Sequence, residues 1–371
     1  MLIFQATHWN EYHTKDSHDM RNYTIQIFGR TMIDKDVCIK VVGFKPYFYV
    51  EIPKRWASFD IELFINALKR KAAFMGRNDN DYDASREFHA HKVVRRQVFN
   101  RFGHNNVRTL LLLQFDSRAA MRLYARALTG PIDIKGQKQV YERYEHNIEP
   151  ILRFIHNRNI QPSGWIEIDP NGAKPLPEYS VCNHNYEVNY LAVHPKDMGT
   201  LIAPIKILSY DIECISGNCD FPNASKLSDK LIQIGMTIYR YGSIECESSY
   251  ILTLKKCSPI PGTTVLCYKT ERGLIKGFAK LIRKIRPDIR TGYYISGFDD
   301  EYIWNRALKR DEVRAMKHGI RYQQLPDKIR DYLRRTYGKL NLDYLKTERV
   351  TEPFTNFTER TLSSSAMGEN I

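Results

Sequence analysis

The stretch LSYDIECIS, Leu208 to Ser216, places two carboxylates on a short β-prone run. Side chains on a strand alternate between its two faces, so Asp211 and Glu213 share one face. Two neighbouring acids on a half-buried strand repel each other, and a divalent metal ion removes that cost. The stretch therefore predicts half of a metal site on a sheet, of the kind used in two-metal phosphodiester cleavage. The opposite face is apolar and predicts a core: Leu208, Tyr210, Ile212 and Cys214.

A plain surface strand is the alternative interpretation of the same residues. The strand would then lie at the edge of a sheet, with Asp211 and Glu213 in water and paired with surface Lys or Arg. An Asp-x-Glu tripeptide is common, so the metal-site interpretation depends on the rest of the chain.

Composition indicates a chain large enough for two domains and a polyanionic partner. The 371 residues include 43% hydrophobic residues, which supports real cores. Lys and Arg number 56 against 42 acids, so the net charge is +14. An excess of this sign favours nucleic acid as a partner, although a merely basic protein is the alternative.

The cysteines and the N-terminus predict an intracellular chain without a membrane partner. The seven cysteines form no C-x-x-C pair, which is typical of reduced thiols. The first residues, MLIFQATHWNEYHTKD, lack the basic and long apolar segments of a signal peptide. No stretch is long and apolar enough to span a membrane.

The first half of the chain predicts a mixed β domain with a small α/β sandwich. Tyr23–Gly29 and Val37–Val42 are β-rich runs, and GFKPYFYVEIP, Gly43 to Pro53, is an aromatic extended segment. Ser58 is placed to begin a helix. The sandwich is completed by a strand and a helix predicted at Thr109–Phe115 and Ser117–Leu128.

Two polar segments of this half have less regular patterns. Residues 76–108 interleave Arg and Lys with aromatic residues, which suits single-stranded nucleic acid but equally a solvated face. Residues 161–200 are rich in Pro, Asn and Gly and predict loops and a linker. We expect a domain boundary near Ala203, which divides the chain into 1–203 and 204–371.

The second half predicts a sheet with an acid on its first strand and another after its fourth. Asp299 would begin a helix that follows the fourth strand, where a helix N-terminus tolerates a carboxylate and could face Asp211 and Glu213. This order matches a ribonuclease-H-like sheet, so the predicted fold class is α/β or α+β. The predicted elements are strands at Ile205–Cys214, Leu231–Tyr239, Tyr250–Leu254 and Ile289–Tyr293, and helices at Thr270–Arg286 and Asp299–Leu308.

Several separated segments resemble those of family B DNA polymerases. LSYDIEC resembles the first exonuclease motif of the family, and GYYISGFDDEYI, Gly292 to Ile303, resembles the second. GFKPYFYVEIP is similar to the N-terminal segment of the family. DFPNASKLSDKLIQIG, Asp220 to Gly235, and TLSSSAMGENI, Thr361 to Ile371, resemble later segments. The matches follow the family order over nearly the whole chain, closest to the delta-like type of eukaryotes and large DNA viruses.

The resemblance implies an N-terminal template-binding domain followed by a 3′→5′ proofreading exonuclease domain. By position, Asp211 and Glu213 take the roles of the first motif, and Asp299 takes that of the second. In the family, such carboxylates hold two Mg²⁺ or Mn²⁺ ions about 4 Å apart. Phe298 and Tyr294 would then contact the primer strand. The implied partners are DNA, the remaining polymerase polypeptide and a sliding clamp, in a nucleus or a viral replication compartment.

Two departures from the family pattern affect the expected activity. Tyr294 stands where the second motif usually has Asn. The third exonuclease motif and the polymerase motifs have no counterpart, because Tyr337 and Asp343 are wrongly spaced. We therefore expect the chain to be a fragment that lacks the fourth carboxylate: a truncated piece, one part of a split gene or a degenerate copy. A stand-alone metal-dependent nuclease and a non-catalytic module that binds single-stranded DNA remain as alternative hypotheses.

Overall fold

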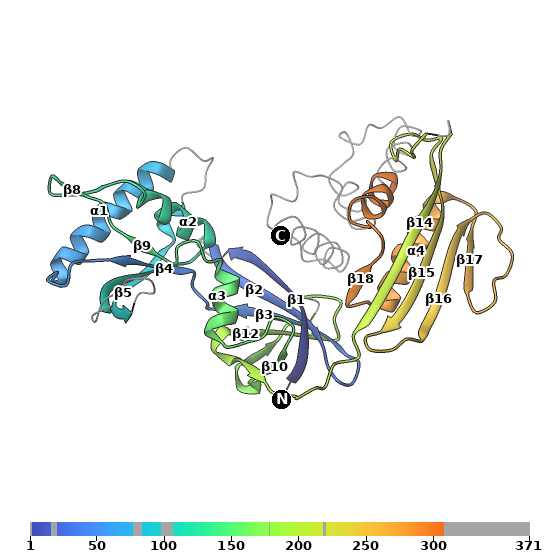
Figure 1. The fold of residues 1–371 in the computed structure, drawn as a ribbon, viewed down its shortest axis with the longest axis horizontal. Helices are drawn as coiled ribbons and strands as arrows, with labels where there is room; N and C mark the ends of the chain where they lie inside the picture. The colour runs from blue at the N-terminus through green and yellow to red at the C-terminus, as the bar shows by residue number, and fades with distance from the viewer. Residues whose placement is uncertain are drawn as a thin grey trace.

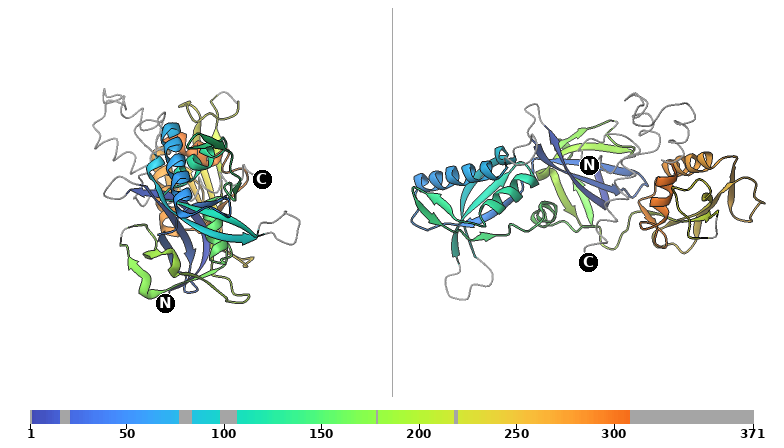
Figure 2. Two further views of the ribbon diagram at one scale, coloured as in Figure 1. Left: turned by 90° about the vertical axis from the view of Figure 1, so that its left-hand side faces the viewer. Right: turned by 90° about the horizontal axis from the view of Figure 1, so that it is seen from above.

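The chain forms three units that lie in a row, each built around its own sheet (Figure 1; Figure 2, right). The computed structural model describes residues 2–15, 21–76, 84–97, 107–177, 179–217 and 220–307. The middle unit and the small α/β unit beside it come from the first half of the chain, and the third unit comes from the second half. This arrangement confirms the predicted mixed α/β fold class.

A seven-stranded sheet forms the middle unit, in the order β11-β12-β3-β2-β1-β10-β13. Only β12 and β3 pair in parallel among these neighbours. The helix α3 (Pro150–Asn157) buries Phe154 in the core of this sheet. The strands are β1 (Leu2–Lys15), β2 (Arg21–Arg30), β3 (Asp36–Val42), β10 (Trp165–Ile168), β11 (Ala173–Pro175), β12 (His184–Asn189) and β13 (Val193–Lys196).

The interpretation of residues 161–200 as loops and a linker is wrong. Four strands of the middle sheet, β10 to β13, come from this segment. They have three to six residues each, and segments with Pro separate β10 from β11 and β11 from β12, so local composition indicates mainly these turns. Pro195 is tolerated because β13 is an edge strand, where a missing N–H costs no ladder hydrogen bond.

The predicted α/β sandwich is confirmed as a four-stranded sheet in the order β5-β6-β4-β9 with two helices. Ser117 caps the second helix by accepting a hydrogen bond from the Ala120 N–H. Within residues 76–108, the structure adds a strand, β5, that the sequence did not predict. The elements are β4 (Tyr47–Glu51), α1 (Ser58–Gly76), β5 (Phe88–Gln97), β6 (Val107–Phe115), α2 (Arg118–Ala127) and β9 (Arg143–Tyr144), with a separate ribbon of β7 (Ile132–Ile134) and β8 (Gln137–Gln139).

The third unit is a five-stranded sheet in the order β17-β16-β15-β14-β18. β14 pairs antiparallel with β15 and parallel with β18, so the first and the last strand of the unit are neighbours. The strand at Thr264–Tyr268 was not predicted, and β18 ends earlier than expected. The elements are β14 (Lys206–Ile215), β15 (Lys230–Arg240), β16 (Cys246–Leu254), β17 (Thr264–Tyr268), α4 (Glu271–Ile285) and β18 (Ile289–Thr291), with a helix over 299–307.

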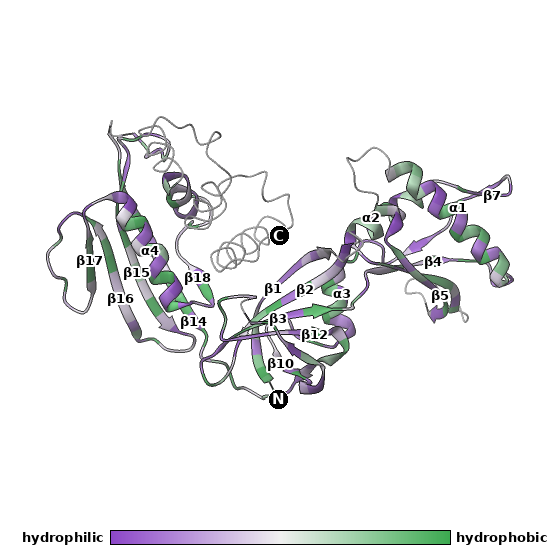
Figure 3. Ribbon diagram, turned by 180° about the vertical axis from the view of Figure 1, so that it is seen from behind, coloured by the Kyte–Doolittle hydropathy of each residue, from purple (hydrophilic) through white to green (hydrophobic). Residues whose placement is uncertain are grey.

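The helix α4 covers one face of this sheet with an apolar stripe, while its other residues are hydrophilic (Figures 1 and 3). As predicted, Thr270 caps the helix, and its hydroxyl accepts from the Gly273 N–H at 3.1 Å. The helix ends at Arg286, which adopts a left-handed conformation before Pro287. Buried residues of the stripe are Leu274, Ile275, Phe278, Leu281 and Ile282.

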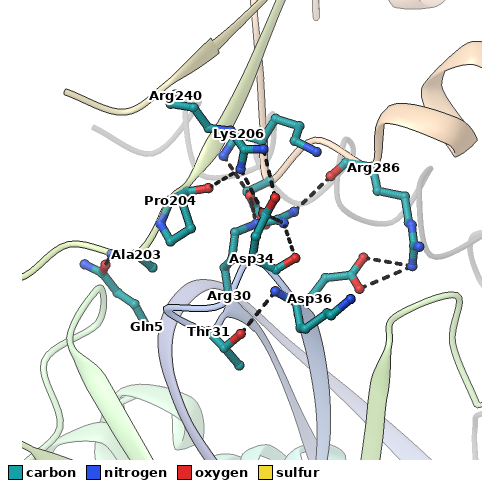
Figure 4. Close-up of polar contacts among 12 residues, drawn as sticks. Gln5, Arg30, Thr31, Asp34, Asp36, Ala203, Pro204, Lys206, Arg240 and Arg286 are labelled. Carbon is teal, nitrogen blue, oxygen red and sulfur yellow. Dashed lines mark hydrogen bonds and ion pairs between the residues drawn. The ribbon is translucent and has the colours of Figure 1, made fainter. Parts of the chain in front are cut away.

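Polar contacts join the loop between β2 and β3 to the third unit (Figure 4). Arg30 donates to Asp288 at 2.5 Å and to the Arg286 carbonyl at 3.1 Å. Asp34 accepts from both terminal nitrogens of Arg240 at 2.8 Å. Asp288 also accepts from the Lys206 N–H, so the contact reaches the first residue of β14.

Some predicted features lie outside the described residues. These are the C-terminal end of the second helix beyond residue 307, Tyr337, Asp343 and the segment Thr361–Ile371. Among the helices that the structure describes, none combines the length and the apolar character needed to cross a bilayer.

Candidate active site

The strand β14 presents its two acids on one face, as the alternation predicts. Asp211 and Glu213 are exposed, whereas Leu208, Tyr210 and Ile212 are buried on the other face. β14 pairs with β15 along its whole length but with β18 only over Ile207–Ser209, so it is an interior strand at its start and has a strand partner on one side only at the acids. Within the described part of the chain, neither acid is paired with Lys or Arg. Their charges are therefore available to a cationic ligand.

Asp299 lies beside this strand because the chain turns back after β18. The ladder between β14 and β18 ends at Ser209 and Thr291. After a turn, Asp299 is the first residue of the helix over 299–307, and its side chain is only 3% exposed. Its Oδ1 accepts a hydrogen bond from the Ile212 N–H at 3.0 Å. The carboxylate thus contacts the strand one residue beyond Asp211.

The electrostatics of Asp299 differ from those of an ordinary surface acid. Burial raises the pKa of Asp299 to about 6, and the charge of Asp211 adds to this effect. The hydrogen bond from Ile212 acts in the opposite direction, because it favours the ionised form. The contact with the Ile212 N–H places the Asp299 carboxylate beside the residue that follows Asp211. A bound cation would offset the cost of burying the ionised carboxylate.

The donor set suits a hard divalent ion, but the described side chains are not gathered around one point. Carboxylate oxygens are the ligands that Mg²⁺ and Mn²⁺ prefer. Asp211 and Asp299 interact electrostatically, and Glu213 lies on the same face of β14. No group of three His, Cys, Asp or Glu residues within the described ranges could hold a metal ion as it stands. The residue types therefore suit such an ion, although the described side chains do not form a three-ligand group.

Aromatic side chains surround the same end of the sheet. Phe298, next to Asp299, is half-buried, and its ring centroid lies 5.1 Å from that of Phe221. Phe221 is 77% exposed, although it is a large apolar residue in a polar loop. Tyr294 is 69% exposed, and its ring occupies the space in which a side chain at Gly297 would lie.

The loop that carries Phe221 is held by an acid that the sequence interpretation missed. Asp229 accepts from the Asn223 N–H at 2.9 Å, from the Gly217 N–H at 3.1 Å and from the Ser228 hydroxyl at 2.7 Å. These hydrogen bonds, that from Asn223 first, lower the pKa of Asp229 to about 2. The adjacent Ser228 and Asp229 directly before a β-prone run were the available sequence signal.

A buried ion pair also holds this loop in place, and it was not predicted from the sequence. Arg306 is fully buried and contacts both carboxylate oxygens of Glu271, at 2.6 and 3.0 Å. It also donates to the carbonyls of Ala224 and Lys226. The helix over 299–307 is thereby joined to α4 and to the loop before β15. Sequence alone gave no signal, because Arg306 and Glu271 are far apart in the chain.

Comparison with known proteins identifies relatives for most of the chain. A sequence model described as the exonuclease domain of DNA polymerase family B matches residues 141–345. The chain is 44% identical over 347 residues to a DNA polymerase of Acanthamoeba polyphaga mimivirus. The matched region covers 92% of this chain and 20% of that protein. It is 32% identical over 298 residues to the DNA polymerase delta catalytic subunit of Drosophila melanogaster. The matched region covers 76% of this chain and 27% of that subunit.

A solved structure shares the fold. The family B DNA polymerase of the hyperthermophilic archaeon Pyrobaculum calidifontis superposes with a TM-score of 0.58 at 18% sequence identity. The match covers 84% of this chain and 33% of that chain. The chain therefore corresponds to a minor part of the length of each relative.

Proposed function

Since this chain belongs to DNA polymerase family B, we propose that it provides the N-terminal and exonuclease portion of a replicative polymerase and removes 3′ nucleotides from DNA. The observation that carries the proposal is the contact of Asp299 with β14, directly beside the exposed pair Asp211 and Glu213. Three acids from two separate segments thereby share one end of a sheet. The proposed division of the chain is an N-terminal domain over 1–203 and an exonuclease domain over 204–371.

Asp211, Glu213 and Asp299 are the residues proposed to hold two divalent ions, Mg²⁺ or Mn²⁺. The ions would stabilise the charge that develops on the phosphate and on the leaving 3′ oxygen. Asp211 and Glu213 project from a part of β14 that is paired with β15, so their positions should change little as substrate enters. Asp299 is anchored through the Ile212 N–H, and its raised pKa favours exchange of a proton for a metal cation.

The aromatic residues are proposed to receive the terminal nucleotide. A base can stack on an exposed ring without regard to its sequence, and Phe221 offers such a ring against Phe298. Tyr294 is also exposed, in the turn that leads to Phe298 and Asp299, and is proposed as a second aromatic contact for the strand. These contacts would orient the scissile phosphate toward the acids. They would not depend on the base sequence of the DNA.

The proposal is tested by trimming of a 5′-labelled single-stranded oligonucleotide in Mg²⁺ or Mn²⁺. We expect Asp211→Ala to lower the rate by about 10²–10³-fold, as when one stabilising group is removed from a transition state. Glu245→Gln, an exposed acid in the hairpin between β15 and β16, is the matched control and should trim normally. Equal rates in the Asp211→Ala variant and the control would reject the proposal.

A second role, holding a single strand, is proposed for the N-terminal half. β5 is the edge strand of its sheet, and Lys92, Arg95 and Arg96 on it are exposed. Lys92 and Arg96 share one face of β5, and basic side chains in such a row neutralise successive phosphates, which would account for binding without catalysis. This observation also supports the alternative of a non-catalytic single-stranded DNA-binding module.

Binding and trimming can be separated with a paired variant. Lys92→Gln/Arg96→Gln should weaken binding of a single-stranded oligonucleotide and reduce the slope of affinity against salt by about two ions. Asp211→Ala should leave that slope unchanged. If the paired variant has the same slope as wild type, β5 is not in the path of the strand.

The remaining expectations concern the cellular context. We propose DNA as the substrate, the remaining polymerase polypeptide as a partner and a sliding clamp as a further partner. The relatives named DNA polymerase in a large virus and DNA polymerase delta in an animal support a nucleus or a viral replication compartment.

A further inference from the structure

Two consecutive acids contact β14 on either side of Asp211. Asp299 accepts from the backbone N–H of Ile212, the residue after Asp211. Asp300 accepts from the side-chain hydroxyl of Tyr210, the residue before it. The start of the helix over 299–307 is therefore joined to the strand at both neighbours of the proposed metal ligand.

Arg290 on β18 completes a cluster of three polar side chains. Its two terminal nitrogens donate to the two carboxylate oxygens of Asp300, at 3.0 and 2.9 Å. Its guanidinium carbon lies 5.6 Å from the centre of the Tyr210 ring. The side chains of Arg290 and Asp300 are only 10% and 22% exposed, and a bidentate pair of this kind fixes orientation as well as distance.

The cluster lies where backbone pairing stops. The ladder between β14 and β18 ends at Ser209, so Tyr210 to Glu213 have no strand partner on that side. Gly292 directly follows β18 and lies very close to β14. A Cβ atom at this position would be 2.3 Å from the Tyr210 carbonyl oxygen. Side chains therefore replace the ladder in holding the turn and the helix against the strand.

We propose that Tyr210, Asp300 and Arg290 are positioning residues that hold Asp299 against β14 and so set its spacing from Asp211. The inference deepens the proposed function, since it concerns the carboxylates that would bind the ions. None of the three contacts the ions or the substrate. Asp300 acts through Asp299, its neighbour on the helix, and Tyr210 acts through Asp211, its neighbour on the strand.

The first test measures Mn²⁺ binding by calorimetric titration of the purified chain, together with its melting temperature. Tyr210→Phe and Asp300→Asn should each weaken Mn²⁺ binding by roughly 10-fold, as removal of an outer-shell partner does. The double variant should bind no more weakly than Asp300→Asn alone, because that variant already weakens the contact with Tyr210. Glu301→Gln, the adjacent exposed acid on the same helix, is the matched control and should bind as wild type.

A merely structural contact predicts a different result. In that case, the two variants would lower the melting temperature and leave Mn²⁺ affinity at the level of Glu301→Gln. That result would overturn the inference. Arg290→Gln provides an independent third variant, for which the same loss of affinity is expected.

The second test does not require metal, so it separates this inference from the proposed function. In EDTA, hydrogen exchange of the Ile212 amide should become faster in Asp300→Asn and Tyr210→Phe, because Asp299 is then less firmly held. The Ile251 amide in β16 is the internal reference and should not change. Absence of Mn²⁺ binding in wild type would reject the proposed function, whereas unchanged exchange at Ile212 would reject the positioning role.

Discussion

At the scale of single residues, Asp299 and Asp300 show how neighbours in sequence take different roles. Asp299 is buried with its oxygen on a backbone N–H, and its pKa is raised. The negative charge of Asp300 is compensated by the guanidinium of Arg290 and by the hydrogen bond from the Tyr210 hydroxyl. The same residue type is thus available to a cation at one position and neutralised internally at the next.

Cys214 is expected to be an unreactive thiol. Burial raises its pKa to about 12, and the thiolate is the reactive form. Iodoacetamide at pH 8 should label Cys214 far more slowly than the exposed Cys246. Mass spectrometry of digested protein gives both rates, and equal rates would show that the thiol is accessible and ionises normally.

Arg306 should be among the residues most sensitive to substitution. Arg306→Met leaves the carboxylate of Glu271 buried without its partner, which costs about 3–5 kcal/mol of unfolding free energy. Denaturant unfolding measures this loss. Lys280→Met, an exposed position on α4, is the control and should change stability little. Arg306→Met/Glu271→Gln should recover part of the loss, and no recovery would indicate a packing defect.

At the scale of elements, local signals placed α4 correctly because all of them are close in sequence. Its cap, its apolar stripe and the following Pro287 lie within one continuous stretch. The short strands β11 and β17 were missed because each depends on a partner elsewhere in the chain, β12 and β16 respectively. Three to five residues carry too little pattern to predict a strand without that partner.

The Thr270 cap provides a direct test at this scale. Thr270→Ala removes the acceptor for the Gly273 N–H and should lower stability by about 1 kcal/mol. Thr270→Ser keeps the hydroxyl and should restore most of the loss. The midpoint of urea unfolding measures both variants, and equal midpoints for the two would exclude the cap as the cause.

At the scale of the whole molecule, the loop between β2 and β3 determines how the third unit is held (Figure 4). Arg30 at the end of β2, Asp34 in the loop and Asp36 at the start of β3 contact Asp288, Arg240 and Arg286, respectively. Asp288 and Lys206 lie at the starts of β18 and β14, the two strands that lead to the acids. The orientation of the candidate site relative to the N-terminal half therefore depends on these pairs.

The stabilising effect of Asp34 should disappear in acid. Hydrogen bonds from Arg240, with Arg30 beside them, lower the pKa of Asp34 from 3.8 to about 2. A lowered carboxyl pKa stabilises the fold above the unfolded value, and that stabilisation is lost as pH falls from about 4 to about 2. The difference in melting temperature between wild type and Asp34→Asn should be constant from pH 5 to 7 and shrink below pH 4. Glu245→Gln is the control, and a difference independent of pH would contradict the assignment.

The sequence by itself determined the alternation of β14, the helix α4 and the resemblance of the two acid-bearing segments to one family. These depend on periodicity and on residues within a few positions of each other. Only the tertiary structure decided that the first residues of β14 lie between β15 and β18, that 161–200 contributes to a sheet and that Asp299 contacts Ile212. It also decided the pairing of Arg306 with Glu271 and of Arg290 with Asp300. Such contacts join residues through space, and burial then sets their charge state, so no local pattern could reveal them.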